Sequence, residues 1–244
     1  MWVVGGPFVR TIIRHKQKND AVRISATHSN LDITRHIEYK RPNVRSDGDK
    51  MSGIRKSPEY TRELILSTAL RLFVERGYFA TSVHDIRRAA GLSTGSIYHH
   101  FESKEALARA LYDDLVKRMT AIVELSAESC QSAHDKGRAI AVALCRAAEE
   151  SPELVHFILH ARHREFLPEA PPICSTRPFE LMKQVAAGGI ASGELRQMDV
   201  LVASVALFGG VIRLLHLSLD GVLDKPLAGY LGDVWEAGWR GVSS

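Results

Sequence analysis

The sequence lacks the short motifs on which several common enzyme classes depend. It has no HExxH zinc motif, no nucleophile elbow and no glycine-rich phosphate loop. Cysteine is scarce as well, because Cys130, Cys145 and Cys174 are widely separated and form no CxxC pair. Neither a zinc ribbon nor a disulfide framework is therefore indicated, and we expect a reducing, cytoplasmic compartment.

Long hydrophobic runs and a secretory signal are also missing. The longest uncharged apolar run extends from Val200 to Ile212 and is shorter than the roughly 20 residues that span a bilayer, so we expect no membrane partner. At the start of the chain the basic residues follow the apolar stretch MWVVGGPFV, whereas a secretory signal has them in front. An organellar transit peptide stays open, because residues 1–19 are basic and contain no acidic residue.

The chain does contain enough apolar residues for a globular core. At 244 residues it can form one domain or two, and 45% of it is hydrophobic. The formal net charge is +4, with basic residues in excess before residue 110 and acidic residues in excess after it. A basic front end on an acidic partner region is typical of proteins that bind nucleic acid.

Residues 1–50 show no sustained hydrophobic period. We expect them to be mostly disordered or weakly structured. Because Met51 opens a plausible start for the patterned region, we predict that residues 1–50 are a translated extension upstream of the natural start. The alternative is a basic arm that adds phosphate contacts.

From Ser57 onward the apolar spacing predicts helices and no strands. Ser57 is a predicted N-cap, and Ser103 caps a long helix that links the front of the chain to the rest. Later helices are predicted at residues 134–150, 152–166, 178–192, 199–219 and 226–239, with a proline-rich loop at 167–178. The helix at 199–219 is nearly all apolar, which predicts burial within the chain or against a second copy.

Two short helices with a glycine-bearing turn are predicted between residues 82 and 99. The first ends at Ala90, Gly91 allows the left-handed turn, and Ser93 caps the second. Only Ile97 and Phe101 look able to anchor the second helix, whose other residues are small or polar. A helix-turn-helix that places its second helix in the DNA major groove fits this pattern.

The run LSTALRLFVERGYFATSVHDIRRAAGLSTGSIYHHFESKEAL at residues 66–107 resembles the DNA-binding domain of the TetR family of bacterial transcriptional regulators. The resemblance implies an all-α homodimer with a three-helix DNA-binding domain at residues 55–103 and a helical ligand-binding and dimerisation domain at 104–244. It also implies dimer contacts through the helices from Asp199 to Leu219 and from Pro226 to Trp239. The partners it implies are a palindromic DNA operator and a small-molecule effector, with no cofactor.

The resemblance further implies which residues contact DNA. The predicted contacts are His84, Thr94, Gly95, Ser96, Tyr98, His99, His100 and Lys104. The second helix contains no Arg, Asn or Gln, so the strongest bidentate base contacts are missing. We therefore expect specificity to rest partly on hydroxyl and methyl contacts and on DNA shape.

The sequence signals for a ligand site, in the part of the chain after the DNA-binding domain, are less specific. His156, His160 and His163 are spaced to share one helix face, which leaves metal binding open beside a pocket for an organic ligand. Cys174, in the proline-rich loop, leaves redox sensing open. The predicted pocket residues are Tyr112, His156, Phe157, His160, Phe179, Met182, Arg213 and His216.

These observations together predict a ligand-responsive DNA-binding regulator, a repressor released from its operator by a small molecule, and not an enzyme. One alternative is a metal- or redox-sensing regulator of the same fold. Another is a histidine-based metal-dependent enzyme, and a third is an architectural protein that uses the fold without ligand control.

Overall fold

The computed structural model describes residues 57–244, and in this range the chain is helical, with one isolated β-bridge between Leu195 and Ser243. The predicted all-α fold class is therefore confirmed. The predictions for residues 1–50 and for Met51 lie outside the described residues. The helices are α3 (Pro58–Arg76), α4 (Val83–Ala90), α5 (Thr94–His100), α6 (Lys104–Ala127), α7 (Ala133–Glu150), α8 (Pro152–His160), α9 (His163–Phe166), the 3-10 helix η2 (Ile173–Ser175), α10 (Arg177–Ser192), α11 (Val200–Leu219) and α12 (Ala228–Val242).

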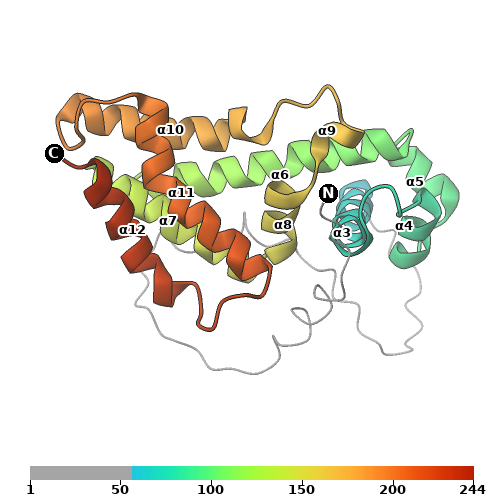
Figure 1. Cartoon of the computed structure of the whole chain (residues 1–244). Coiled ribbons are helices and arrows are strands. Elements are labelled where there is room, and N and C mark those ends of the chain that lie inside the picture. Colours follow the sequence, from blue (N-terminus) through green and yellow to red (C-terminus); the bar gives the residue numbers. More distant parts are fainter. Residues whose placement is uncertain (1–56) are drawn as a thin grey trace.

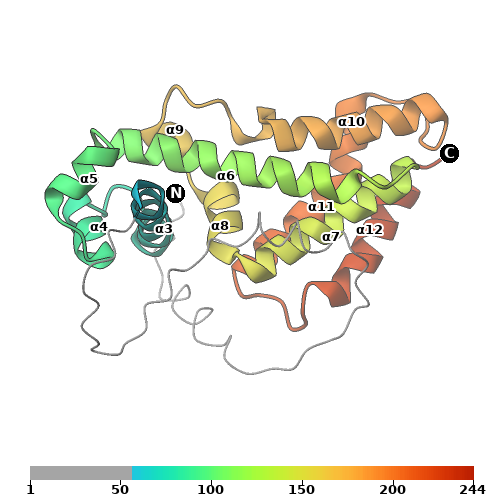
Figure 2. The same ribbon diagram turned by 180° about the vertical axis from the view of Figure 1, so that it is seen from behind.

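The long helix α6 connects two ends of an elongated molecule. Helices α3, α4 and α5 gather at its start, and α7, α10, α11 and α12 surround its other end (Figures 1 and 2). Helix α8 lies between the two groups and packs against both α3 and α7. We refer to α3–α5 as the head and to the remaining helices as the body.

The predicted helix starts are confirmed by side-chain caps. The hydroxyl oxygen of Ser57 accepts from the backbone N–H of Tyr60 at 3.2 Å, and that of Ser103 accepts from Ala106 at 3.1 Å. These bonds satisfy N–H groups that have no partner inside the helix. Because the cap and the amide are only three residues apart, this interaction can be found from sequence.

The predicted helix at residues 152–166 is wrong in its second half. Helix α8 ends at His160, Ala161 is extended (φ −70°, ψ 132°), and α9 begins only at His163. The break turns His163 toward Tyr112 and Phe157, so the three histidines do not share one helix face. The proline-rich loop is also not entirely irregular, since it contains η2.

Helix α11 has one buried side and one exposed side. Ala203 and Leu207 are buried, whereas Leu201, Val202 and Val205 are between 57% and 60% exposed. The prediction that α11 is buried within its own chain is therefore wrong for this exposed face. Burial of the face against a second copy stays a prediction. The helix is also longer than the run from Val200 to Ile212, and by length and composition it could cross a membrane, a property that core helices of soluble proteins share.

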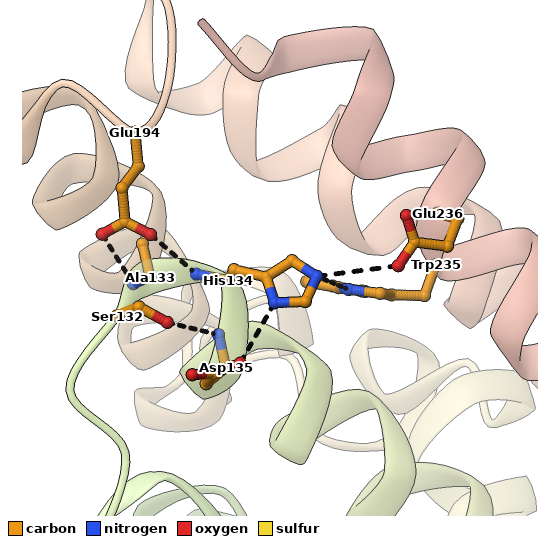
Figure 3. Close-up of polar contacts among 7 residues, drawn as sticks. All are labelled: Ser132, Ala133, His134, Asp135, Glu194, Trp235 and Glu236. Atoms are coloured by element: carbon orange, nitrogen blue, oxygen red, sulfur yellow. Dashed lines mark hydrogen bonds and ion pairs between the residues drawn. The ribbon is translucent and has the colours of Figure 1, made fainter.

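The end of the body remote from the head is tied together by polar contacts (Figure 3). The Glu194 carboxylate accepts from the backbone N–H groups of Ala133 and His134 at 2.9 and 3.2 Å, which caps α7 from a distant part of the chain. The Trp235 indole N–H of α12 donates to His134 Nε2 at 3.3 Å. His134 Nδ1 therefore carries the proton and donates to Asp135 at 3.1 Å.

Candidate nucleic-acid interface and ligand cavity

The α4–turn–α5 unit is held by local hydrogen bonds and by one left-handed residue. Ser82 and Asp85 form a reciprocal capping box at the start of α4, and Gly91 ends the helix with φ 65°. Ser93 Oγ then accepts from the N–H of Ser96 at 3.1 Å and caps α5. The letters of residues 91–95 fit GxSxG, but Ser93 lies between two helices and caps the second, so it forms no nucleophile elbow.

Helix α5 has few anchors and a large exposed surface. Ile97 is 1% exposed and Phe101, which ends the helix, is 5% exposed. The predicted DNA-contacting residues, on α5 and on the neighbouring starts of α4 and α6, are exposed to different degrees. Exposed are His84, Thr94, Gly95, Tyr98 and His99, and half-buried are Ser96, His100 and Lys104. The head thus presents the hydroxyl and imidazole groups of two helices on its surface.

Lys104 has internal contacts that the sequence did not indicate. Its Nζ donates to the carbonyls of Tyr78 and Thr81 at 3.1 and 3.0 Å and lies 4.0 Å from the centre of the Tyr78 ring. An ammonium group has three N–H donors, so one remains for a phosphate. The side chain therefore stabilises the turn between α3 and α4, and its predicted phosphate contact stays an expectation.

The charged groups around the two helices are mostly paired locally. Arg87 donates to His84 Nε2 at 3.1 Å, and Arg88 bonds Asp85 at 3.1 Å. Burial lowers the pKa of His100, and the neighbouring His99 and Arg62 lower it further. The free head therefore carries little fixed positive charge on α5 itself, which fits recognition through hydroxyl groups and shape.

An apolar cavity lies in the body. Its volume is about 370 Å³, which includes the space where it opens to solvent. Of the predicted pocket residues, Phe179 and Met182 lie in its wall. The other lining residues are Met119, Val123, Leu144, Val155, Ile158, Leu159, Pro178, Ile212 and Leu215. Sequence reasoning missed these, although Val155, Ile158 and Leu159 have the spacing of one helix face. No polar side chain lines the wall, so the cavity suits an apolar ligand group.

The remaining predicted pocket residues form two other groups. His160 lies between His156 and His216, with ring centres 4.6 and 4.8 Å away, and its Nε2 is 3.6 Å from Asp220. Burial lowers the pKa of His156 to about 4 and also lowers that of His160. Within residues 57–244 no three His, Cys, Asp or Glu side chains are placed to hold a metal ion.

The second group, Tyr112 and Phe157, packs around His163, and Arg213 is exposed. Cys174 is exposed as well, whereas burial raises the pKa of the Cys145 thiol to about 12. Neither the histidines nor Cys174 therefore joins the apolar cavity wall.

Comparison with known proteins identifies the head. Residues 65–111 match the family model described as bacterial regulatory proteins, tetR family. The HTH-type transcriptional repressor KstR2 of Rhodococcus jostii is 44% identical over 72 residues, which are 28% of this chain and 35% of that protein. KstR2 of Mycolicibacterium smegmatis is 29% identical over 148 residues, which are 59% of this chain and 72% of that protein. The chain thus spans only about a third of the length of the first of these relatives.

Solved structures show the same fold over most of the chain. A TetR family regulator from Marinobacter aquaeolei has a TM-score of 0.63 at 23% identity and covers 78% of this chain and 100% of its own. The regulator FadR from Bacillus subtilis, solved in complex with stearoyl-CoA, has a TM-score of 0.64 at 20% identity and covers 73% of this chain and 97% of its own. The matched head, the repressor-named relatives and the shared fold agree: residues 65–111 match the DNA-binding domain of the TetR family, and the described chain has the fold of the TetR family regulators to which it is similar.

Proposed function

We propose that the chain is a transcriptional repressor that binds an operator as a homodimer and releases it when an apolar small molecule enters the cavity. The DNA-binding part of this proposal is supported chiefly by the structure of the α4–turn–α5 unit. Helix α5 is held by Ile97 and by Phe101 at its end, and its hydroxyl and imidazole groups are on the outside. The two KstR2 relatives that match this region are named repressors.

The proposed DNA contacts follow from the position of each group. Thr94 and Ser96 open α5, where hydroxyls and free N–H groups suit phosphates and base edges. Tyr98 is 52% exposed and is placed to meet the backbone or a thymine methyl group. His84, Gly95, His99 and His100 complete the surface, and Lys104 contributes its third N–H.

The exposed apolar face of α11 supports the homodimer. Helix-turn-helix dimers bind two half-sites about one DNA turn apart, so their operators are palindromic. Leu201, Val202 and Val205 would be covered by α11 and α12 of a second copy, which would remove an apolar surface from water. A regulator of this kind acts in the cytoplasm, and we propose no enzymatic activity for it.

The DNA-binding half is tested with fragments from upstream of the protein's own gene. We expect binding measured by fluorescence anisotropy to weaken steeply between 50 and 300 mM salt, as phosphate contacts require. T94A and S96A should each change the preference between operator variants by up to about tenfold. S175A removes an exposed hydroxyl in η2, outside the head, and serves as the control. No binding to any upstream fragment at low salt would overturn the proposal.

The ligand half rests on the apolar wall of the cavity. A chain or ring system without charge would fit it, and the FadR neighbour binds stearoyl-CoA. We propose an effector with a long apolar group and test it by thermal shift with acyl-CoA compounds of increasing chain length. Longer chains should raise the melting temperature more than acetyl-CoA does.

Two variants of α10 make this test specific. Phe179 and Leu181 are both half-buried, but only Phe179 lines the cavity. F179Q should lose most of the ligand-induced shift, and L181Q should keep it. If both variants respond alike, the acyl-CoA binds elsewhere. If no chain length raises the melting temperature, an acyl effector is ruled out while the DNA-binding half stands.

A further inference from the structure

His163 is a buried imidazole without a hydrogen-bond partner. The residue is 7% exposed, and neither Nδ1 nor Nε2 has a partner within hydrogen-bond geometry. Most buried polar atoms in folded proteins are paired, so an unpaired one calls for a physical reason. His163 lies in α9, the four-residue helix that the break after α8 directs toward the head.

The ring is surrounded by aromatic side chains from three helices. Its centre lies 4.9 Å from Tyr112 of α6, 4.9 Å from Phe157 of α8 and 5.9 Å from Phe166 of α9. The charged residues of its own segment, Arg162, Arg164 and Glu165, are exposed, and Arg162 pairs with Glu165 at 3.0 Å. The Tyr112 hydroxyl donates to the carbonyl of Pro171, and its oxygen forms no hydrogen bond with either nitrogen of the imidazole.

Phe166 connects this cluster to the head. Its ring stacks on Tyr78, with centres 4.3 Å apart and an angle of 14°. Tyr78 follows the end of α3, its hydroxyl donates to Glu105 at 3.0 Å, and its other contacts include the Lys104 ammonium. Phe157 in turn stacks on Phe73 of α3 at 6.4 Å. Helix α9 therefore packs against the turn that precedes the helix-turn-helix.

The same segment is attached to the cavity wall. Val155, Ile158 and Leu159 of α8 line the cavity, and α9 begins three residues after α8 ends. A movement of α8 would be carried directly to His163 and Phe166, because only Ala161 and Arg162 separate the two helices.

We propose that α9 is a proton-sensitive latch: neutral His163 keeps Phe166 stacked on Tyr78, and protonation of His163 drives α9 away from the head. A cationic imidazolium within this aromatic cluster would have neither water nor a carboxylate partner. Unpacking α9 gives the ring access to water. The latch itself is independent of the repressor role. Any change in DNA binding when α9 leaves the head rests on that proposed function.

The direction of the pH dependence follows from linkage. Burial lowers the pKa of His163 below its ordinary value of 6.5, and weak polar contacts with the backbone of Ile158 and Phe157, which fall short of hydrogen-bond geometry, partly oppose this shift. No charged side chain among the described residues contributes to the pKa of this ring. The closed latch therefore keeps its full stability above pH 6.5 and loses it as the pH falls below that value.

Hydrogen exchange measured by mass spectrometry at pH 7.5 and pH 5.5 tests the latch without DNA. After correction for intrinsic rates, exchange in residues 162–170 and 77–85 should be up to about tenfold faster at the lower pH. Exchange in α12 should not change. In H163F, and in H163L as a second variant, both segments should exchange equally at the two pH values.

H156F is the matched control, because it removes a half-buried imidazole that lies on α8 and has no ring contact with Phe166 among the described contacts. It should respond to pH as the natural protein does. The latch is refuted if residues 162–170 show no pH response, if α12 opens together with them, or if the His163 variants still respond. Since no operator is involved, such a result leaves the proposed repressor function untouched, and failure to bind DNA leaves the latch untouched.

Discussion

Lys104 shows how a single side chain can combine a structural task with a predicted binding task. It connects the start of α6 to the carbonyls of Tyr78 and Thr81, residues 26 and 23 positions earlier in the chain. The resemblance to other regulators indicated only a phosphate contact for this lysine. The carbonyl partners could not be predicted, because their approach depends on how α3, α4 and α6 pack.

We expect K104M to lower the free energy of unfolding by about 1–3 kcal/mol, since it leaves two carbonyls without their charged donor. Urea unfolding followed by circular dichroism measures this. K117M replaces an exposed lysine of the same helix and should change stability by less than about 0.5 kcal/mol. If the third N–H does reach a phosphate, K104M also lowers the slope of log affinity against log salt by about 1. Equal stability of the two variants would refute the structural role.

At the scale of helices, local sequence signals predict where most helices begin but do not predict where a helix is interrupted. The caps at Ser57, Ser93 and Ser103 depend on residues three positions away, so the sequence predicts them correctly. The break between α8 and α9 has no proline or glycine to mark it. The break accompanies the packing of Phe166 on Tyr78, a contact between residues 88 positions apart that no local pattern reveals.

The crossing of α11 and α12 depends on a glycine. A Cβ atom at Gly238 would lie 2.8 Å from the backbone oxygen of Ala206, which cannot move aside as a flexible side chain could. We therefore expect G238A to destabilise the protein by about 1–3 kcal/mol. Thermal unfolding measures the effect.

Gly232 of the same helix provides the matched control. A Cβ atom there would meet nothing within 4 Å, so G232A should be neutral or stabilising by up to about 1 kcal/mol, because alanine favours the helix. Were G238A as stable as G232A, the two helices would have to cross less closely than the structure indicates.

At the scale of the whole molecule, the exposed face of α11 is the feature that one chain alone does not account for. We expect L201E and V205E each to convert a dimer into a monomer, because a carboxylate would have to be buried between two copies. Size-exclusion chromatography with light scattering gives the mass. V222E alters a valine that is 66% exposed but lies in the loop after α11, and it should remain dimeric. A monomeric natural protein would contradict the proposed assembly.

The sequence predicted the all-α architecture and the position of the helix-turn-helix, because helix periods and caps are local. The cavity was predicted only at Phe179 and Met182, since its wall is assembled from α6, α7, α8, α10 and α11. Predicted pocket histidines at 156, 160 and 216 instead meet one another beside Asp220. Which side chains converge from five helices is decided by tertiary packing and leaves no trace in a single helix pattern.

The hydrogen bonds at the remote end of the body bear on where a rotation of the head would pivot. Glu194 and Trp235 fasten the start of α7 to two other segments, so rotation of α6 would pivot near that end (Figure 3). Helix α6 has 24 residues and is therefore about 36 Å long. A rotation of about 10° would displace the head by about 6 Å, close to the rise of two base pairs at about 3.4 Å each. In the proposed dimer, a small change at the cavity would thus be amplified into a mismatch with the spacing of the two proposed half-sites.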